Sequence, residues 1–167
     1  MARLVFTAVV LAVLGVSGCA IVAPEIAPGG RAVRPGDPGG PFAASSMRVD
    51  GLTGFGELGG RPVLTVHLEL LDRWGHVVKS SGRLELSLVP ARGGAEPTVY
   101  DVDLNDLRLN ARLYDPVTRT YRVTLERLPG FASAAARGDG TLMVLATLTL
   151  PGADGEDDLI RARGEVR

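Results

Sequence analysis

The chain has 167 residues, of which 46% are hydrophobic and 22% are charged, and its formal net charge is -1. This composition is typical of one globular domain rather than a disordered or fibrous chain. The 18 basic residues are balanced by 19 acidic ones, so no excess of positive charge indicates a nucleic-acid partner. The single cysteine excludes an intramolecular disulfide.

Residues 1–18 have the pattern of an export signal. Arg3 provides a short basic start, and residues 4–16 form an almost unbroken apolar run. As a helix this run would be roughly 20 Å long, which is short of the ~30 Å hydrocarbon core of a bilayer. The pattern therefore favours a cleaved signal peptide over a transmembrane helix.

The apolar run ends in Val16, Ser17, Gly18 and Cys19. These four residues resemble the lipobox of bacterial lipoproteins, with an aliphatic residue, two small residues and a cysteine. The resemblance implies cleavage before Cys19, lipidation of its thiol and acylation of its new amino group. It also implies an exported protein anchored in a membrane by lipid, and Ala20 favours the outer membrane where the cell has one. The alternatives are an ordinary secretory signal with an incidental cysteine and an uncleaved membrane helix.

Residues 19–46 combine the candidate lipidated cysteine with a segment rich in proline and glycine. Such a segment has no hydrophobic periodicity and cannot pack a core. We expect a flexible tether that spans on the order of 30 Å as a coil. A peptide ligand for a proline-binding module is the alternative, but a clean P-x-x-P context is missing.

Residues 47–167 alternate between apolar and polar side chains, which predicts strands with one buried face. The alternating runs lie at residues 64–70, 84–88, 100–104, 107–113, 121–125 and 142–150. Turn residues separate them at 72–75, 92–94, 115–116 and 152–155, and only residues 131–137 favour a helix. The pattern predicts an all-β fold, an antiparallel β-sandwich. With its tight polar turns at 71–78 and 114–121, the domain resembles immunoglobulin-like or transthyretin-like sandwiches.

Several local patterns indicate no cofactor and no metal. Residues 54–59 spell G-x-G-x-x-G, but an alternating strand rather than a helix follows them. Asp101, Asp103 and Asn105 begin a calcium-loop spacing whose later positions fail, so we expect a solvated strand face. The acidic residues at 154 and 156–158 favour a solvated hairpin tip.

Trp74, His67 and His76 are the remaining candidates for a site. Trp74 is the single tryptophan and falls at a predicted turn tip, where it is a candidate contact residue; the alternative is that it folds back over the sheet edge. The two histidines have too few companion ligands for zinc. A Ser-His-Asp arrangement would need a buried polar cluster around one of them.

We therefore expect a lipid-anchored cell-envelope protein with a non-catalytic β-sandwich that binds or braces another envelope component. The partners expected are the membrane, through the lipid, and an envelope protein or a glycan. A carbohydrate or small-ligand binding module is the second hypothesis, and a hydrolase is the third.

Overall fold

The computed structural model describes residues 42–92, 94–152 and 155–167. Nine strands and two short helices form the described part of the chain. Their bounds are β1 Ser46–Val49, β2 Gly54–Leu58, β3 Arg61–Leu71, β4 Arg83–Pro90, β5 Thr98–Asp103, α1 Leu107–Leu113, β6 Tyr114–Asp115, β7 Thr120–Leu125, α2 Gly130–Ala135, β8 Leu142–Pro151 and β9 Asp157–Val166.

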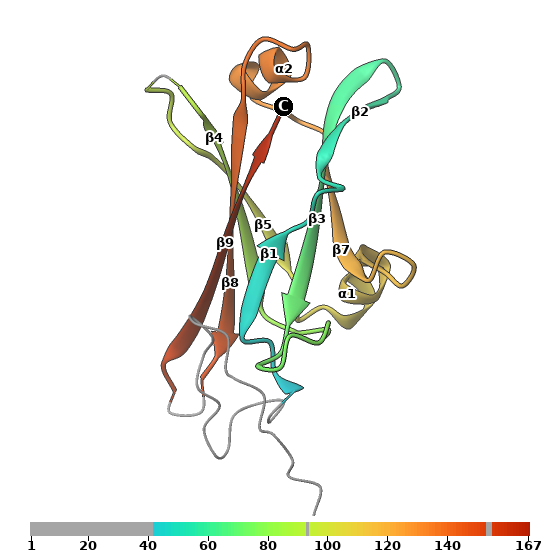
Figure 1. Cartoon of the computed structure of the whole chain (residues 1–167), viewed down its shortest axis with the longest axis vertical. Helices are drawn as coiled ribbons and strands as arrows, with labels where there is room; N and C mark the ends of the chain where they lie inside the picture. The colour runs from blue at the N-terminus through green and yellow to red at the C-terminus, as the bar shows by residue number, and fades with distance from the viewer. Residues whose placement is uncertain (1–41, 93, 153–154) are drawn as a thin grey trace, which may run out of the picture.

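The strands form two antiparallel sheets, which confirms the predicted all-β sandwich (Figure 1). The first sheet has the order β1-β3-β7-β6, and β2 continues the β1 edge along β3. The second sheet has the order β5-β4-β8-β9. In immunoglobulin lettering these orders are A-B-E-D and C′-C-F-G. Of the two sandwiches that the sequence resembles, the strand order therefore matches the immunoglobulin-like one.

The core lies between the two sheets and is filled by the inward side chains of the predicted runs. Leu64, Val66 and Leu68 of β3 face Leu84, Leu86 and Leu148 of the second sheet within one continuous cluster of buried residues. Ala44 belongs to this cluster, and the amide of Ser45 donates to the Leu71 carbonyl at 2.8 Å. The packed domain thus includes residues that precede Met47.

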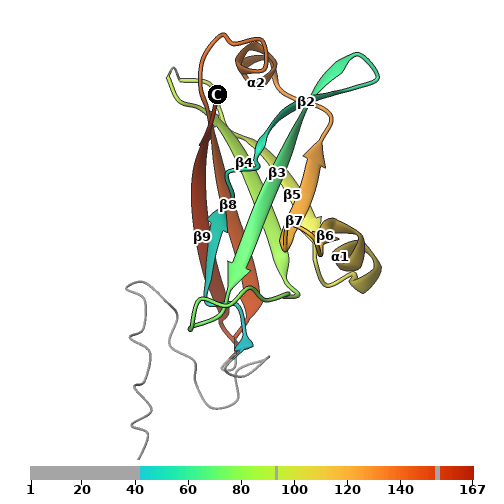
Figure 2. The ribbon, with the colours of Figure 1, turned by 45° about the vertical axis from the view of Figure 1, so that its right-hand side comes forward.

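The two ends of the sandwich differ. We call the end where residues 42–45 join β1 the entry end; it also holds the β3–β4 loop and the turn between β8 and β9 (Figure 1). The opposite, or far, end holds α2, the turn between β2 and β3, the β4–β5 loop and the C-terminus, as both views show (Figure 2). The chain therefore enters the domain at one end and ends at the other.

The strand predicted at residues 107–113 is wrong, because these residues form helix α1. Asp106 caps the helix: its Oδ1 accepts hydrogen bonds from the amides of Arg108 at 2.9 Å and Leu109 at 3.2 Å. The alternation of leucines does not mark a buried face, since Leu107 is 75% exposed and Asn110 is the buried residue of the helix. The cap at Asp106 and the hydrogen bonds of the buried Asn110 favour a helix here, although the sequence alternates with a period of two.

The sequence predicts that the turn at residues 72–75 closes a hairpin between neighbouring strands. This prediction is wrong, because β3 and β4 lie in different sheets. After an isolated bridge between Leu71 and Val77, the chain crosses to β4 in the other sheet. Buried polar contacts fix this crossing: Asn110 Nδ2 donates to the Ser80 carbonyl at 2.8 Å, and the Ser80 amide donates to the Tyr121 hydroxyl at 3.0 Å. The crossing loop is therefore held by α1 and β7.

The strand pairs β4–β5, β6–β7 and β8–β9 lie on either side of the predicted turns at 92–94, 115–116 and 152–155. Residues 93, 153 and 154 of these turns lie outside the described residues. The predicted helix at 131–137 is confirmed as α2. Among the described residues, we find no helix with the length and apolar character needed to cross a bilayer.

Candidate functional site

A hollow at the far end is the strongest candidate for a binding site. It has a volume of about 440 Å³ and lies between α2 and the end of β4. The residues that line it are Pro90, Ala91, Arg92, Phe131, Ala134, Ala135, Asp139, Gly140 and Thr141. Ligand sites are commonly ~300–1,000 Å³ in volume, so the hollow can hold a small ligand or one or two side chains of a partner.

Backbone contacts position the lining residues. The Ala91 amide donates to the Thr141 carbonyl at 3.0 Å, which fixes the chain after β4 against the start of β8. On the other side, α2 turns back through Gly138 and Gly140, whose φ angles of 88° and 121° are ones that side-chain-bearing residues rarely adopt. These two glycines let Asp139 sit beside the opening.

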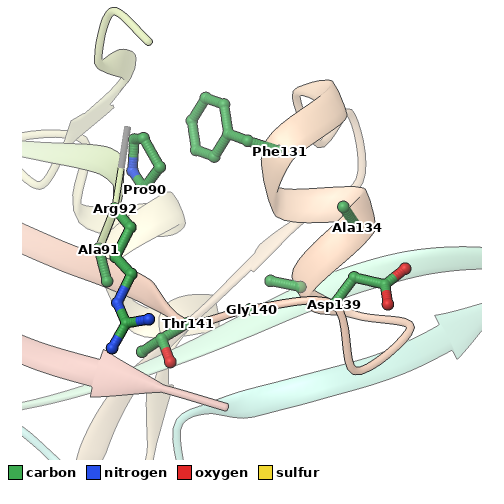
Figure 3. Close-up of a pocket in the computed structure, with 9 residues that line it drawn as sticks. Pro90, Ala91, Arg92, Phe131, Ala134, Asp139, Gly140 and Thr141 are labelled. Atoms are coloured by element: carbon green, nitrogen blue, oxygen red, sulfur yellow. The ribbon is translucent and has the colours of Figure 1, made fainter. Parts of the chain in front are cut away.

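The side chains of the hollow have mixed chemistry (Figure 3). Phe131 extends from α2 toward Pro90, while the guanidinium of Arg92 lies beside Thr141 and the carboxylate of Asp139 lies on the opposite side. Arg92 and Asp139 are exposed, and Phe131 is half-buried. An arginine beside a hydroxyl can bind a carboxylate through paired hydrogen bonds. The hollow therefore suits a group with an apolar body and a negative charge on its Arg92 side, away from the Asp139 carboxylate.

Trp74 lies in the β3–β4 loop at the entry end and is half-buried. Its ring centroid is 5.5 Å from that of Phe42, and the Arg73 guanidinium lies 5.2 Å from the Trp74 centroid. The tyrosines make other contacts: Tyr114 packs edge-on against Tyr121 at 5.4 Å, and the Tyr100 hydroxyl donates to the Arg127 carbonyl. The candidate contact Trp74 is thus separate from the hollow.

His67 does lie in a buried polar cluster, on the outer face of the first sheet. Its Nδ1 is 2.9 Å from Thr120 Oγ1, which is 2.8 Å from Thr118 Oγ1. Burial lowers the pKa of His67, although the carboxylates of Asp50 and Asp115 oppose the shift. Thr120 is only 2% exposed, so its hydroxyl is out of reach of a substrate carbonyl.

His76 lies apart from His67, on the β3–β4 loop. Its Nδ1 is 3.4 Å from Oδ2 of Asp72, and its side chain is mostly exposed. Asp72 Oδ1 accepts the amides of Trp74 and His76, each at 2.8 Å, so this carboxylate closes the turn. The contact between Asp72 and His76 therefore has a structural role in closing the turn.

The other sequence patterns have local explanations. The G-x-G-x-x-G segment forms β2 and the start of its turn, followed by strand β3. Asp101 and Asp103 are exposed on β5, and Asp103 Oδ1 accepts the Asn105 amide at 3.0 Å. Asp154 lies outside the described residues. Among the residues that the structure describes, no three histidine, cysteine or carboxylate side chains gather as metal ligands.

The signal residues Val16, Ser17 and Gly18 and the candidate lipidation site Cys19 lie outside the described residues. The hollow was not predicted from the sequence. The sequence pattern placed a turn at Arg92 and a helix at Phe131, but the two segments are far apart in the chain and only the sheet order brings them together.

Comparison of the chain with known protein families, with curated proteins and with solved structures found no match.

Proposed function

We propose that this protein is a lipid-anchored cell-envelope protein whose β-sandwich binds or braces another envelope component through its far end. The anchor is Cys19, the tether is the segment that follows it up to the start of the packed domain, which already includes Ala44 and Ser45, and the domain has no catalytic role. The expected location is the outer membrane where the cell has one.

The proposal rests on the observation that the chain joins the sandwich at one end and that the hollow lies at the other. Residues 42–45 join β1 at the entry end, whereas α2 and the hollow lie at the far end (Figure 1). A lipid at Cys19 would pull on the entry end, because that is where the chain joins the packed domain. The far end would then be free to point away from the membrane.

The chemistry of the two polar clusters supports a non-catalytic role. The hydroxyl nearest to His67 belongs to the buried Thr120, and the carboxylate nearest to His76 is engaged by two backbone amides. A nucleophile and its base need an open position for the reacting atom. The His67–Thr120 pair is buried, and the partner of the exposed His76 is a carboxylate that the turn already engages. These features count against the hydrolase hypothesis.

A carbohydrate or small-ligand binding module is the second candidate function. The size of the hollow and the combination of Phe131 with Arg92 favour it. In this case the ligand would be an acidic sugar or another small anion with an apolar face, since Arg92 supplies the binding charge and Phe131 the contact surface.

The test uses the full chain in its own cells, with a photoreactive residue at Ala134 in the hollow. We expect one defined cross-linked envelope component. Arg92→Glu reverses the charge at the rim and should lower its yield by about tenfold, the effect of losing a substantial contact residue.

The matched control is Arg61→Glu, which reverses another exposed charge at the far end but outside the hollow. This variant should cross-link as the wild type does. An equal yield from Arg92→Glu and wild type, or a product only from a photoreactive residue at the exposed Ser81 near the entry end, would contradict the proposal.

A further inference from the structure

The outer face of the second sheet, β5-β4-β8-β9, carries an unusual arrangement of charge. Its central side chains are exposed or half-buried, and a shallow depression of about 470 Å³ crosses it. We call this surface the β4–β8 face. Its outward residues are Val99, Asp101, Asp103, Arg83, Glu85, Ser87, Val89, Met143, Leu145, Thr147, Thr149, Leu159, Arg161, Arg163 and Glu165.

The strand register sets these residues in rows across the face. One row runs Asp101, Glu85, Thr147, Arg161, because these residues are direct partners in successive strand pairs. The β5 side of the face is therefore acidic, and the middle of β9 is basic. Asp101 and Arg161 are three strand spacings apart, about 14 Å, and cannot pair within one chain.

The β4–β8 face also contains apolar surface, and the charged side chains on it pair only weakly with one another. Leu145, at the centre of the face, is 39% exposed and Val99 is 50% exposed. Arg83 Nε lies 3.7 Å from Asp101 Oδ1, but both side chains are largely exposed, so this pair leaves the aspartate open to a second partner. Among the described residues, neither Arg161 nor Arg163 has an ion-pair partner.

We propose that the β4–β8 face binds the same face of a second copy of this chain, about a two-fold axis parallel to the strands and between β4 and β8. This rotation exchanges the β5 and β9 sides of the face. It leaves the position of each row along the strand direction unchanged. Asp101 of one copy then faces Arg161 of the other, and the contact occurs twice because the interface is self-complementary. Ser87 and Leu145 face one another in the adjacent row.

The other face-to-face arrangement is excluded by charge. A two-fold axis perpendicular to the strands would place β5 over β5 and β9 over β9. Acidic residues would then oppose acidic residues and arginines would oppose arginines, so the contacts would be repulsive. Only the axis parallel to the strands gives complementary charges.

The chosen axis also fits the proposed membrane anchor, on which this part of the inference rests. Rotation about an axis parallel to the strands leaves both entry ends on the same side of the dimer. Two tethers that leave in the same direction can be anchored in one membrane. The excluded axis would send the two tethers in opposite directions.

The size of the face predicts a weak dimer in solution. Four strands are about 19 Å wide, and seven residues along each are about 24 Å long, so roughly 450 Å² would be buried on each copy. This area is below the ~800 Å² per partner of a standard stable interface. Confinement of both copies in one membrane raises their effective concentration and favours pairing.

The experiment measures cross-linking of the full chain in membranes, with Ser87→Cys in all variants and a short bifunctional maleimide as the probe. Wild-type charges should give a dimer band. Arg161→Glu and Asp101→Arg should each weaken dimerisation by about tenfold, because both symmetric contacts become repulsive. Arg61→Glu, outside the face, should have no effect.

The decisive sample combines both changes in one chain. Asp101→Arg with Arg161→Glu restores opposite charges across the interface, so the dimer band should return, as it should when the two single variants are mixed. The inference is overturned if the singles cross-link like the wild type, if the double variant stays as weak as the singles, or if the only product has the mass of a different protein.

A control separates this inference from the anchoring proposal. Fatty-acid labelling of the same samples reports the lipid independently, and the cross-link is repeated in detergent. A dimer without label would refute the anchor and leave the interface; label without a dimer would refute the interface alone. Circular dichroism of each variant verifies that it is folded.

Discussion

Asp72 shows how a single buried carboxylate organises the crossing between the sheets. The residue is 3% exposed and its Oδ1 accepts the amides of Trp74 and His76. Burial raises the pKa of Asp72, but the two amides and the His76 imidazole outweigh it and hold the pKa below its ordinary value. The folded state therefore favours the charged carboxylate.

We expect Asp72→Ala to lower the free energy of unfolding by about 1–3 kcal/mol at neutral pH, since it leaves two amides without an acceptor. Asp72→Asn keeps an acceptor oxygen and should cost less. The part of the stability that depends on the charge of Asp72 is fully present above the pKa that Asp72 has in the unfolded chain. It is lost as the pH falls through the lower pKa of Asp72 in the folded state. Urea titrations across this acidic range should show the wild type and Asp72→Asn converging; a constant difference would contradict the assignment.

At the scale of elements, the sandwich closes along one side where β1 contacts β9. Gly164 on β9 makes this approach feasible, because a Cβ there would lie 2.6 Å from Val49 Cγ1. Sheet edges that meet this closely need a residue without a side chain at the crossing.

Gly164→Ala should therefore lower the free energy of unfolding by about 1–3 kcal/mol through overpacking. Adding Val49→Ala removes the nearest methyl groups and should recover part of the loss, which thermal unfolding of the single and double variants would reveal as non-additivity. Gly56→Ala on β2 is the control, because its Cβ would meet only Val63 Cγ2 at an ordinary 3.8 Å. Additive effects of Gly164→Ala and Val49→Ala would contradict this account.

The strands and helices also show which parts of the fold could be predicted from the sequence. Strand β4 was predictable because its inward leucines alternate with the outward Arg83, Glu85 and Ser87. Helix α1 was not, because its leucines also alternate and the deciding contacts, those of Asp106 and Asn110, involve a cap and a distant loop. The burial of His67 depends on neighbours from other strands, and the hollow at Arg92 and Phe131 depends on the sheet order.

At the scale of the whole molecule, the proposed function depends on the direction of the sandwich, from its entry end to its far end. The entry end receives the chain and the far end carries the hollow, so a lipid at Cys19 would present the hollow to the envelope. The proposed two-fold pairing would keep this direction, with two hollows facing the same way.

Metabolic labelling of the source cells with a fatty acid tests that anchor most directly. Two or three acyl chains would hold the protein in the membrane, whereas one gives only marginal binding. We expect the wild-type chain to carry the label and to fractionate with membranes. The Cys19→Ala variant should carry no label. An unlabelled wild-type chain, or equal labelling of Cys19→Ala, would contradict the account.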